Sequence, residues 1–365
     1  MKGKKDKMNK KSYLSKRSYI EASKKFMRLA ETTQVVFPRN GREETVKTRM
    51  SHSYEVMNSA MMLAESLDCG GLVIDYQKAI GNVCLLHDIG HPSFGHEGAR
   101  IINEVLVGLG LKEGFDDNNN NLVVIEKEQL QLEPYDLASL IKYPEKLYKS
   151  QAKYLRMLEN AIDEDIKYFS SKIKFTQRPK RTLACEIMDE ADRNSYVCSD
   201  MTDFYSLGWG TSKEMLELFN SGYKSFEIKS FLSTIAKAID EKDKGLIKRT
   251  FNQLKISLNE NYMLVDNLQL EPINYELIDL REKLYEIEKA LFIHHKLVKA
   301  QRAEHSEMLR EYIQDVLEGY YPSRTYKEKI EKTKGLDKLR AIRDMLGETT
   351  DWYVQMYIKD KRSKS

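Results

Sequence analysis

Proline and cysteine are both scarce in this chain. Its 365 residues include seven prolines, so long stretches are free of the residue that most strongly breaks helices. The four cysteines lie far apart and form no C-x-x-C pair; they are Cys69, Cys84, Cys185 and Cys198. This usage argues against a disulfide framework and predicts a reduced, cytoplasmic setting.

Long apolar runs and a large net charge are missing as well. A membrane-spanning helix needs about 20 apolar residues in a row, and the sequence has no such run. No apolar core follows the basic N-terminus, so we expect no secretion signal. The net charge of +3 gives no reason to expect nucleic-acid binding by the whole chain. Residues 1–17 are lysine-rich, and we favour a disordered, solubilising tail there over an accessory contact with single-stranded DNA.

Helical periodicity dominates what remains, which predicts an all-α protein. We expect a helical core in residues 18–210 and further helices in residues 211–365 that complete the same domain. The Asn-rich run 115–121 is too polar for a core and predicts a loop, and residues 34–37 form the best β-type run. The helical stretches are 51–67, 76–86 after a capping Asp75, 99–109, a helix from Leu122, 182–207, 213–249, 275–317 and 335–357.

A histidine and an aspartate stand side by side where an apolar helix ends. Residues 85–92 read LLHDIGHP, and the glycine and proline end the helix. Adjacent side chains on a helix diverge by about 100°, so His87 and Asp88 can share one ion only near that end. An isolated buried charge is prohibitive, so this carboxylate needs a partner or a metal. Together with His52 upstream and Asp192 downstream, two imidazoles and two carboxylates predict a hydrolytic site for one divalent cation.

The same residues also have plainer interpretations. Asp192 could form an ion pair with Arg193, and Arg49 could pair with Glu44 or Glu55. The donor types leave the ion open among Mn, Mg, Fe and Zn, with Mn or Mg favoured, because imidazoles and carboxylates prefer different metals.

Several segments around these residues carry a family resemblance. The order H…HD…D is similar to that of HD-domain metal-dependent phosphohydrolases. The wider segments resemble the dGTPase family of deoxynucleoside triphosphate triphosphohydrolases, in family order and over nearly the whole chain. They are FMRL with TQV (26–35), RMSHSYEV (49–56), HDIGHPSFGH (87–96), SLIKYP (139–144), IMDEADRNSYVCSD (187–200), and RD with TTDWY (343–353).

The resemblance implies hydrolysis of a dNTP, with dGTP favoured, to a deoxynucleoside and intact triphosphate by water attack at the α-phosphorus. It assigns the metal to His52, His87, Asp88 and Asp192. It assigns proton chemistry to His96, with His91 assisting. The implied substrate-binding residues are Gln34, Arg49, Lys142, Tyr143, Arg193, Tyr196 and Asp200.

The ring of Tyr196 would exclude a ribose 2′-hydroxyl, and Asp200 with Gln34 would bind the 3′-hydroxyl. Lys142 and Tyr143 would reach the β- and γ-phosphates, and Arg49 the α-phosphate. The plainer alternative makes Tyr196 a core tyrosine and Asp200 a surface carboxylate. For His96 and His91, the alternative is a loop histidine that bonds to the backbone.

The match also departs from the family pattern. The family glutamate three residues after His96 is Ala99 here, and an acid stands instead at Glu97, which we take as a candidate catalytic residue. Residues 118–120 and Val123 differ from the family's next segment, and Arg193 replaces an aspartate. The alternatives are therefore an HD-domain phosphohydrolase acting on another nucleotide, or a catalytically weakened dNTP-binding regulator. The resemblance also implies a homo-oligomer, tetrameric or hexameric.

Overall fold

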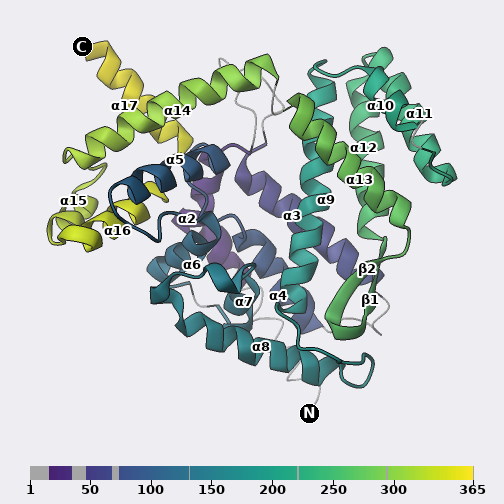
Figure 1. The fold of residues 1–365 in the computed structure, drawn as a ribbon, viewed down its shortest axis with the longest axis horizontal. Coiled ribbons are helices and arrows are strands. Elements are labelled where there is room, and N and C mark those ends of the chain that lie inside the picture. The colour runs from purple at the N-terminus through teal and green to yellow at the C-terminus, as the bar shows by residue number, and fades with distance from the viewer. Residues whose placement is uncertain are drawn as a thin grey trace. The chain divides into compact units, whose positions relative to one another are not determined.

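Helices dominate the structure, a computed structural model that describes residues 16–34, 47–67, 74–130, 132–219, 222–292 and 295–364. The strands within these residues form a single two-stranded antiparallel hairpin (Figure 1). The predicted all-α class is therefore confirmed. Among the same residues, no helix combines the length and apolar character that crossing a membrane requires.

The elements follow one another in a simple order. The first part of the chain contains α2 (Lys24–Met27), η1 (Arg28–Glu31), α3 (Arg49–Ser66), α4 (Ile74–Leu86), α5 (Gly95–Gly108), α6 (Asp117–Glu128), α7 (Pro134–Ser139), η3 (Pro144–Lys146), η4 (Lys149–Gln151), α8 (Lys153–Phe169) and α9 (Leu183–Ser206). The second part contains α10 (Ser212–Phe219), α11 (Phe226–Asp240), α12 (Lys244–Asn259), β1 (Tyr262–Val265), η5 (Asp266–Leu268), β2 (Gln269–Pro272), α13 (Tyr275–Ile287), the π-helical η6 (Glu288–Phe292), α14 (Lys296–Leu317), α15 (Arg324–Glu331), α16 (Gly335–Leu346) and α17 (Asp351–Lys364).

Local signals account well for α9, which carries one of the predicted metal ligands. The Thr182 side chain accepts the Cys185 N–H at the start of the helix, the usual role of a threonine N-cap. Gly208 follows the end with a φ of 71°, a conformation that suits glycine. The predicted stretches 213–249 and 275–317 are instead broken, the first into α10, α11 and α12 and the second by the π-helical turn before α14.

The Asn-rich run contradicts the prediction of a loop. Helix α6 begins at Asp117 rather than at Leu122, because the Asp116 side chain caps it by accepting the Asn119 N–H at 2.8 Å. Asn119, Asn120 and Asn121 are buried in the helix. Their amides bond to backbone groups of neighbouring segments, and this pairing lets polar side chains occupy a core.

Two further sequence predictions differ from the structure. The hairpin of β1 and β2 was not predicted, because its strands are only four residues long. The predicted β-type run 34–37 lies outside the described residues except for Gln34, whose neighbour Thr33 forms an isolated bridge with Thr48. Asp75 lies inside α4, which begins one residue earlier, rather than before it.

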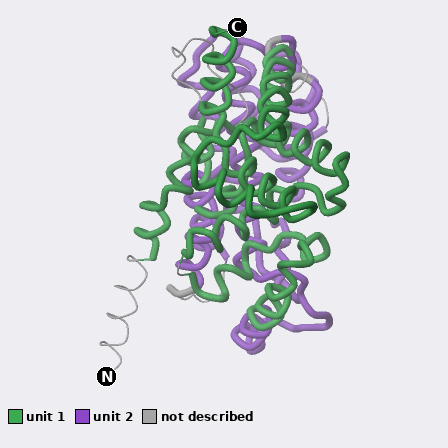
Figure 2. The backbone as a smooth tube through the Cα atoms, turned by 90° about the vertical axis from the view of Figure 1, so that its left-hand side faces the viewer, with its two compact units in different colours: residues 1–53, 85–161, 300–365 green, residues 54–84, 162–299 purple. Residues whose placement is uncertain are grey.

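The chain forms two compact units (Figure 2), which we describe separately. Unit 1 comprises residues 1–53, 85–161 and 300–365, and unit 2 comprises residues 54–84 and 162–299. The boundary expected near residue 210 falls inside unit 2, and the predicted tail 1–17 lies outside the described residues except for its last two.

Unit 1 has a core built mainly from α5, α14, α16 and α17. Its apolar side chains include Ile101, Ile102, Leu106, Leu309, Ile313, Val316, Ile342, Met345, Leu346, Val354 and Ile358, all buried. In unit 2, α9 packs against α12 and α13. A buried amide pair, Asn194 to Asn259 at 3.0 Å, joins α9 to α12, and Arg281 of α13 donates to Glu190 of α9 at 2.7 Å. These contacts hold the α9 residues in place.

One carboxylate joins three elements of unit 1. Glu348 accepts hydrogen bonds from Tyr326 of α15 at 2.6 Å and from Lys127 of α6 at 2.9 Å, and it also contacts Lys25 of α2. Burial alone would raise its pKa, but the charges of the two lysines and the hydrogen bonds lower the pKa to about 2.

We predict that Glu348→Gln destabilises the protein at pH 7 by about 3 kcal/mol, since each pKa unit corresponds to about 1.4 kcal/mol. A carboxylate with a depressed pKa stabilises the fold above its unfolded pKa of about 4.3. The advantage of the wild type over the variant should therefore shrink as the pH falls from about 5 toward 2. Urea unfolding at several pH values measures this. Glu331→Gln, an exposed change on α15, should cost under about 1 kcal/mol; equal losses in both variants would contradict the assignment.

Candidate functional site

The predicted site residues of unit 1 gather around the turn between α4 and α5. Helix α4 ends at Leu86, and α5 begins at Gly95, so the HDIGHPSF segment forms the connection. The first turn of α3 carries Arg49 and His52, and the Thr48 hydroxyl caps this helix by accepting the Ser51 N–H at 3.2 Å. A helix start and a helix end thus supply the residues.

Two imidazoles and a carboxylate of unit 1 offer donors to a cation. The ring centroids of His52 and His87 lie 5.5 Å apart. His87 Nε2 lies 3.5 Å from Asp88 Oδ1. The exposed fractions of His52, His87 and Asp88 are 1%, 4% and 5%. Buried nitrogen and oxygen donors of this kind suit a divalent metal. Asp192, the fourth predicted ligand, lies on α9 in unit 2.

Asp88 is held as a carboxylate by positive groups. Arg49 Nη1 donates to its Oδ2 at 2.7 Å, and His91 Nδ1 lies 3.0 Å from its Oδ1. Burial would raise the pKa of Asp88, but the charges of His91, His87 and Arg49 hold it well below the usual range. Arg49 is thus paired with Asp88. Of the two glutamates proposed as its partners, Glu44 lies outside the described residues, and Glu55 contacts Lys255 and Ser199 within unit 2.

A second cluster was missed in part by sequence reasoning. His91 Nε2 lies 3.0 Å and His96 Nδ1 3.3 Å from the same oxygen of Asp117. The two rings meet edge to face, with centroids 5.3 Å apart. Burial would raise the pKa of Asp117, but the charges of the histidines and their hydrogen bonds hold it well below its usual range. The available signal for Asp117 was a pair of acids before a polar run, which is typical of a helix start.

The carboxylates of Asp88 and Asp117 in turn affect the pKa of His91. Burial and the charge of Arg49 lower the pKa of His91, but Asp88 and Asp117 outweigh them, so its pKa is raised. His91 is thus a buried imidazole between two carboxylates. It is not the loop histidine bonded to backbone that the plainer interpretation expected.

The backbone of this connection is held by side chains from distant segments. Asn121 donates to the His87 carbonyl at 2.5 Å and accepts from the Gly90 N–H at 2.6 Å. Asn120 donates to the Gly90 carbonyl at 2.7 Å. Arg28 donates to the Ile89 and His91 carbonyls at 2.9 and 2.8 Å. Sequence analysis named none of these groups as part of the site.

A buried aspartate fixes the end of the connection. Asp351 accepts the Phe94 N–H at 2.5 Å and both the N–H and the hydroxyl of Thr33. Burial raises the pKa of Asp351 despite these hydrogen bonds. Phe94 has a φ of 61°, and its ring stacks on His305 with centroids 4.6 Å apart. The start of α5, and with it His96, is therefore located by Asp351.

The predicted catalytic Glu97 is engaged elsewhere. Its carboxylate accepts from Arg100 Nε at 3.0 Å and from the Ser306 hydroxyl at 2.9 Å. Hydrogen bonds from Arg100 lower its pKa. His96 therefore has Asp117 beside it, while Glu97 binds one neighbour on α5 and one on α14.

Three predicted phosphate-binding residues also lie in unit 1. A Cβ at Gly95 would stand 2.7 Å from Arg49 Nη2 and 3.9 Å from the Gln34 carbonyl oxygen, so these segments approach closely at a glycine. Gln34 Oε1 is buried and accepts no hydrogen bond from the described residues. Lys142 and Tyr143 line a small hollow together with Asp116, Asn118 and Asn119 at the start of α6.

The remaining predicted residues lie on α9 in unit 2. Tyr196 donates to Glu288 at 2.6 Å, and burial raises its pKa. Asp200 is buried, so the alternative of a surface carboxylate is wrong. Arg193 contacts Asp189 at 3.2 Å and Glu190 at 3.4 Å rather than Asp192.

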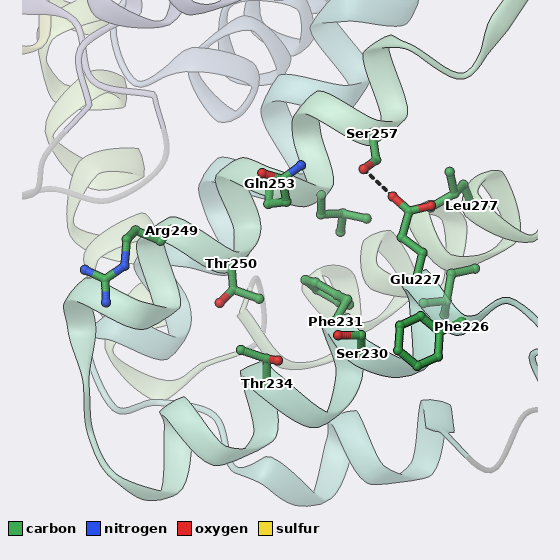
Figure 3. A pocket seen from close by; sticks show the side chains of 12 residues that line it. Phe226, Glu227, Ser230, Phe231, Thr234, Arg249, Thr250, Gln253, Ser257 and Leu277 are labelled. Carbon is green, nitrogen blue, oxygen red and sulfur yellow. Dashed lines mark hydrogen bonds between the residues drawn. The ribbon is translucent and has the colours of Figure 1, made fainter.

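Unit 2 also holds an open pocket, with a volume of about 550 Å³, that contains no predicted site residue. Figure 3 shows its walls on α11 and α12, with Phe226 at one end and Arg249 at the other. Its side chains are mainly apolar or hydroxyl-bearing, and Glu227 is bound by Ser257. We assign no chemistry to this pocket.

Comparison with known families places an HD domain at residues 49–196. Among curated proteins, a deoxyguanosinetriphosphate triphosphohydrolase-like protein from Rickettsia bellii is 25% identical over 288 residues, which cover 76% of this chain and 70% of that protein. A protein of the same name from Corynebacterium efficiens is 30% identical over 51% of this chain and 44% of its own length. Deoxyguanosinetriphosphate triphosphohydrolase-like protein 1 of Deinococcus radiodurans is 27% identical over 57% of this chain and 48% of its own length.

The alignments with the last two relatives span about half of those proteins. The HD domain itself includes the whole H…HD…D order from His52 to Asp192. The resemblance to dGTPase-like HD-domain proteins is therefore confirmed.

We predict that Gly90→Ala destabilises the protein by at least about 2 kcal/mol. The added methyl would lie 2.2 Å from the Asn121 backbone nitrogen and 2.5 Å from the Asn120 carbonyl carbon, so the backbone must shift. Gly108→Ala on α5 is the matched control, because nothing lies within 4 Å of a Cβ there. That variant should gain up to about 1 kcal/mol in stability from helix propensity. Equal stabilities of the two variants in urea would contradict the close approach.

Proposed function

Starting from a chain that carries an HD domain related to those of dGTPase-like proteins, we propose that it is a metal-dependent deoxynucleoside triphosphate triphosphohydrolase. The products would be a deoxynucleoside and intact triphosphate. The observation that carries this proposal is the grouping, within unit 1, of buried His52, His87 and Asp88 with Arg49 and with an exposed His96. Metal donors, a phosphate-binding cation and a proton donor together match the needs of phosphoryl chemistry.

The donor set fits a divalent cation. His52, His87 and Asp88 supply nitrogen and oxygen donors from a buried place, and we propose Asp192 as the fourth ligand from the H…HD…D order. When bound, such an ion polarises a phosphoryl oxygen and lowers the pKa of a coordinated water. Mixed donors favour Mn or Mg here, with Fe or Zn as alternatives.

Arg49 would bind the α-phosphate. Its guanidinium is already fixed by Asp88, and the remaining N–H groups of the fork can reach a phosphate oxygen without a large rearrangement. Lys142 and Tyr143, which lie in a hollow beside the start of α6, would meet the β- and γ-phosphates. These contacts would neutralise the negative charge of the triphosphate and so ease the approach of the attacking water to the α-phosphorus.

His96 would give a proton to the 5′-oxygen of the departing deoxynucleoside. An imidazole suits this role because it exchanges protons near neutral pH. Its side chain is 80% exposed and can therefore meet a substrate that enters from solvent. His91 would support the site from within.

The sugar would be recognised by Tyr196, Asp200 and Gln34. A tyrosine ring against the deoxyribose leaves no room for a ribose 2′-hydroxyl, and a carboxylate can accept the 3′-hydroxyl proton. Asp200 is buried, as a residue that binds one specific hydroxyl should be. Arg193 would add positive charge toward the triphosphate. We favour dGTP as the substrate because the relatives are named deoxyguanosinetriphosphate triphosphohydrolase-like proteins.

One observation favours a second candidate function. The acid expected three residues after His96 is Ala99, so the chain could be a dNTP-binding regulator with weakened catalysis. An HD-domain phosphohydrolase acting on another nucleotide is the third candidate. The tetrameric or hexameric assembly and the cytoplasmic setting remain parts of the proposal that rest on the sequence. For residues 1–17, an accessory single-stranded DNA contact remains the alternative to a solubilising tail.

We predict that chromatography of products will find deoxynucleoside and intact triphosphate after incubation with a dNTP and Mn or Mg. GTP should give no product, and a chelator should abolish the reaction. His87→Ala and Asp88→Ala should lose both metal binding and turnover. Cleavage that persists in those variants would rule out the proposal, and tight dNTP binding without product would favour the regulator.

We also predict that Tyr196→Ala raises the ratio of GTP to dGTP hydrolysis by about 10-fold or more, because the ring no longer excludes the 2′-hydroxyl. Tyr196→Phe is the matched control, since it keeps the ring and loses only the hydroxyl that binds Glu288. The ratio of kcat/KM values measures the effect and is insensitive to the amount of folded enzyme. An unchanged ratio in Tyr196→Ala would remove this residue from sugar selection.

A further inference from the structure

We propose that Asp117 positions His96 as the proton donor and so stands in for the acid that is missing at position 99. The proposal rests on the function proposed above and adds a residue to it. It is carried by the close approach of His96 on α5 to Asp117 on α6: His96 Nδ1 lies 3.3 Å from Asp117 Oδ2.

The geometry distinguishes the two nitrogens of His96. A carboxylate beside Nδ1 accepts the proton of that nitrogen and so fixes the orientation of the ring. Nε2 is then the nitrogen left to meet the substrate, as in a hydrolase in which an aspartate orients a histidine. The side chains agree with these roles, because His96 is 80% exposed while Asp117 is only 13% exposed.

Asp117 is itself held rigidly. It is the first residue of α6, whose cap is the neighbouring Asp116, so its backbone is fixed by a hydrogen-bonded helix start. The positive end of the helix favours an ionised carboxylate at this place. The same oxygen lies 3.0 Å from Nε2 of the buried His91, so a second imidazole adjoins the carboxylate.

The other nearby acid does not compete for the role. Glu97 is adjacent to His96 in the chain, but Arg100 and Ser306 bind its carboxylate. Ala99 has no polar group to offer. Among the described residues, Asp117 supplies the carboxylate that lies within 4 Å of a His96 ring nitrogen.

The step that Asp117 supports is a simple proton transfer. The water oxygen forms a bond to the α-phosphorus, and the bond from phosphorus to the 5′-oxygen breaks with its electron pair on that oxygen. His96 gives the proton on Nε2 to the 5′-oxygen, which leaves as an alcohol. The attacking water loses a proton to solvent, and His96 regains one from solvent for the next turnover. Asp117 keeps the Nδ1 proton bonded throughout and is not consumed.

The same three side chains offer donor atoms that could hold a cation. We favour the positioning role because His96 is largely exposed and because His91 Nε2 and His96 Nδ1 lie 3.0 and 3.3 Å from one carboxylate oxygen. A cation held there would predict a different outcome in the test below.

The test compares Asp117→Asn with Glu126→Gln, which removes the same charge from an exposed position of the same helix, away from the site. Asp117→Asn should lower kcat for a dNTP by about 100-fold or more with little change in KM, because the proton donor is no longer held. Glu126→Gln should keep nearly full activity. Equal kcat values in Asp117→Asn and the wild type, with the wild type active, would overturn the proposal.

A dNTP with sulfur in place of the 5′-bridging oxygen separates proton delivery from folding. A thiolate leaves without a proton, so Asp117→Asn should cleave this analogue at nearly the wild-type rate. His96→Ala, an exposed change, should show the same selective loss. Loss on both substrates by His96→Ala would overturn the proposal, whereas a wild type that cleaves neither substrate would refute the proposed function instead.

Metal content provides the remaining readout. Elemental analysis of protein saturated with Mn should find the same number of ions in the wild type and in Asp117→Asn. One ion fewer in the variant would assign this cluster to a second cation and overturn the positioning role.

Discussion

A buried turn must have its backbone groups hydrogen-bonded, and this requirement organises the polar interior of unit 1. An unpaired buried backbone group costs about 1–3 kcal/mol. The connection between α4 and α5 contains several buried backbone groups that need partners. Asn120 and Asn121 bind the middle of it, Arg28 binds two of its carbonyls, and Asp351 binds its last N–H. Because the same connection carries His87 and its neighbours, satisfying the backbone also fixes the side chains that would bind metal and substrate.

The parts predictable from sequence are those set by local chemistry. The bounds of α9 follow from a threonine cap and a glycine stop, and the HD motif was legible because two polar residues end an apolar helix. The prediction of a loop over the Asn-rich run failed because non-local contacts decide its structure. Its amides are stabilised by backbone groups about 30 residues away, so polarity alone suggested a loop where the chain forms a buried helix. The break of 213–249 into three helices did have local signals that periodicity alone missed, because Ser225 caps α11 and Asp243 caps α12.

The ion pair of Arg49 and Asp88 illustrates why spacing alone could not assign charges. By closeness in sequence, Glu44 and Glu55 were the candidate partners of Arg49, but the chain brings together residues 39 positions apart. Burying both charges carries a desolvation cost that their attraction only partly offsets. A site that must receive a polyanion and a cation gains from this arrangement, because the charged groups are already dehydrated and oriented before the ligands arrive.

The first turn of α6 contacts both the proposed proton donor and the turn that carries the HD pair. Its first residue, Asp117, lies against the exposed imidazole, and residues three and four positions later clamp the turn that carries the HD pair. An acid one turn along α5 would move only with its own helix. An acid on α6 instead ties the orientation of His96 to the same hydrogen bonds that fix Gly90. Placing the carboxylate there therefore makes the proton donor and the metal-binding turn respond to one set of contacts, so any rearrangement of α6 would disturb both.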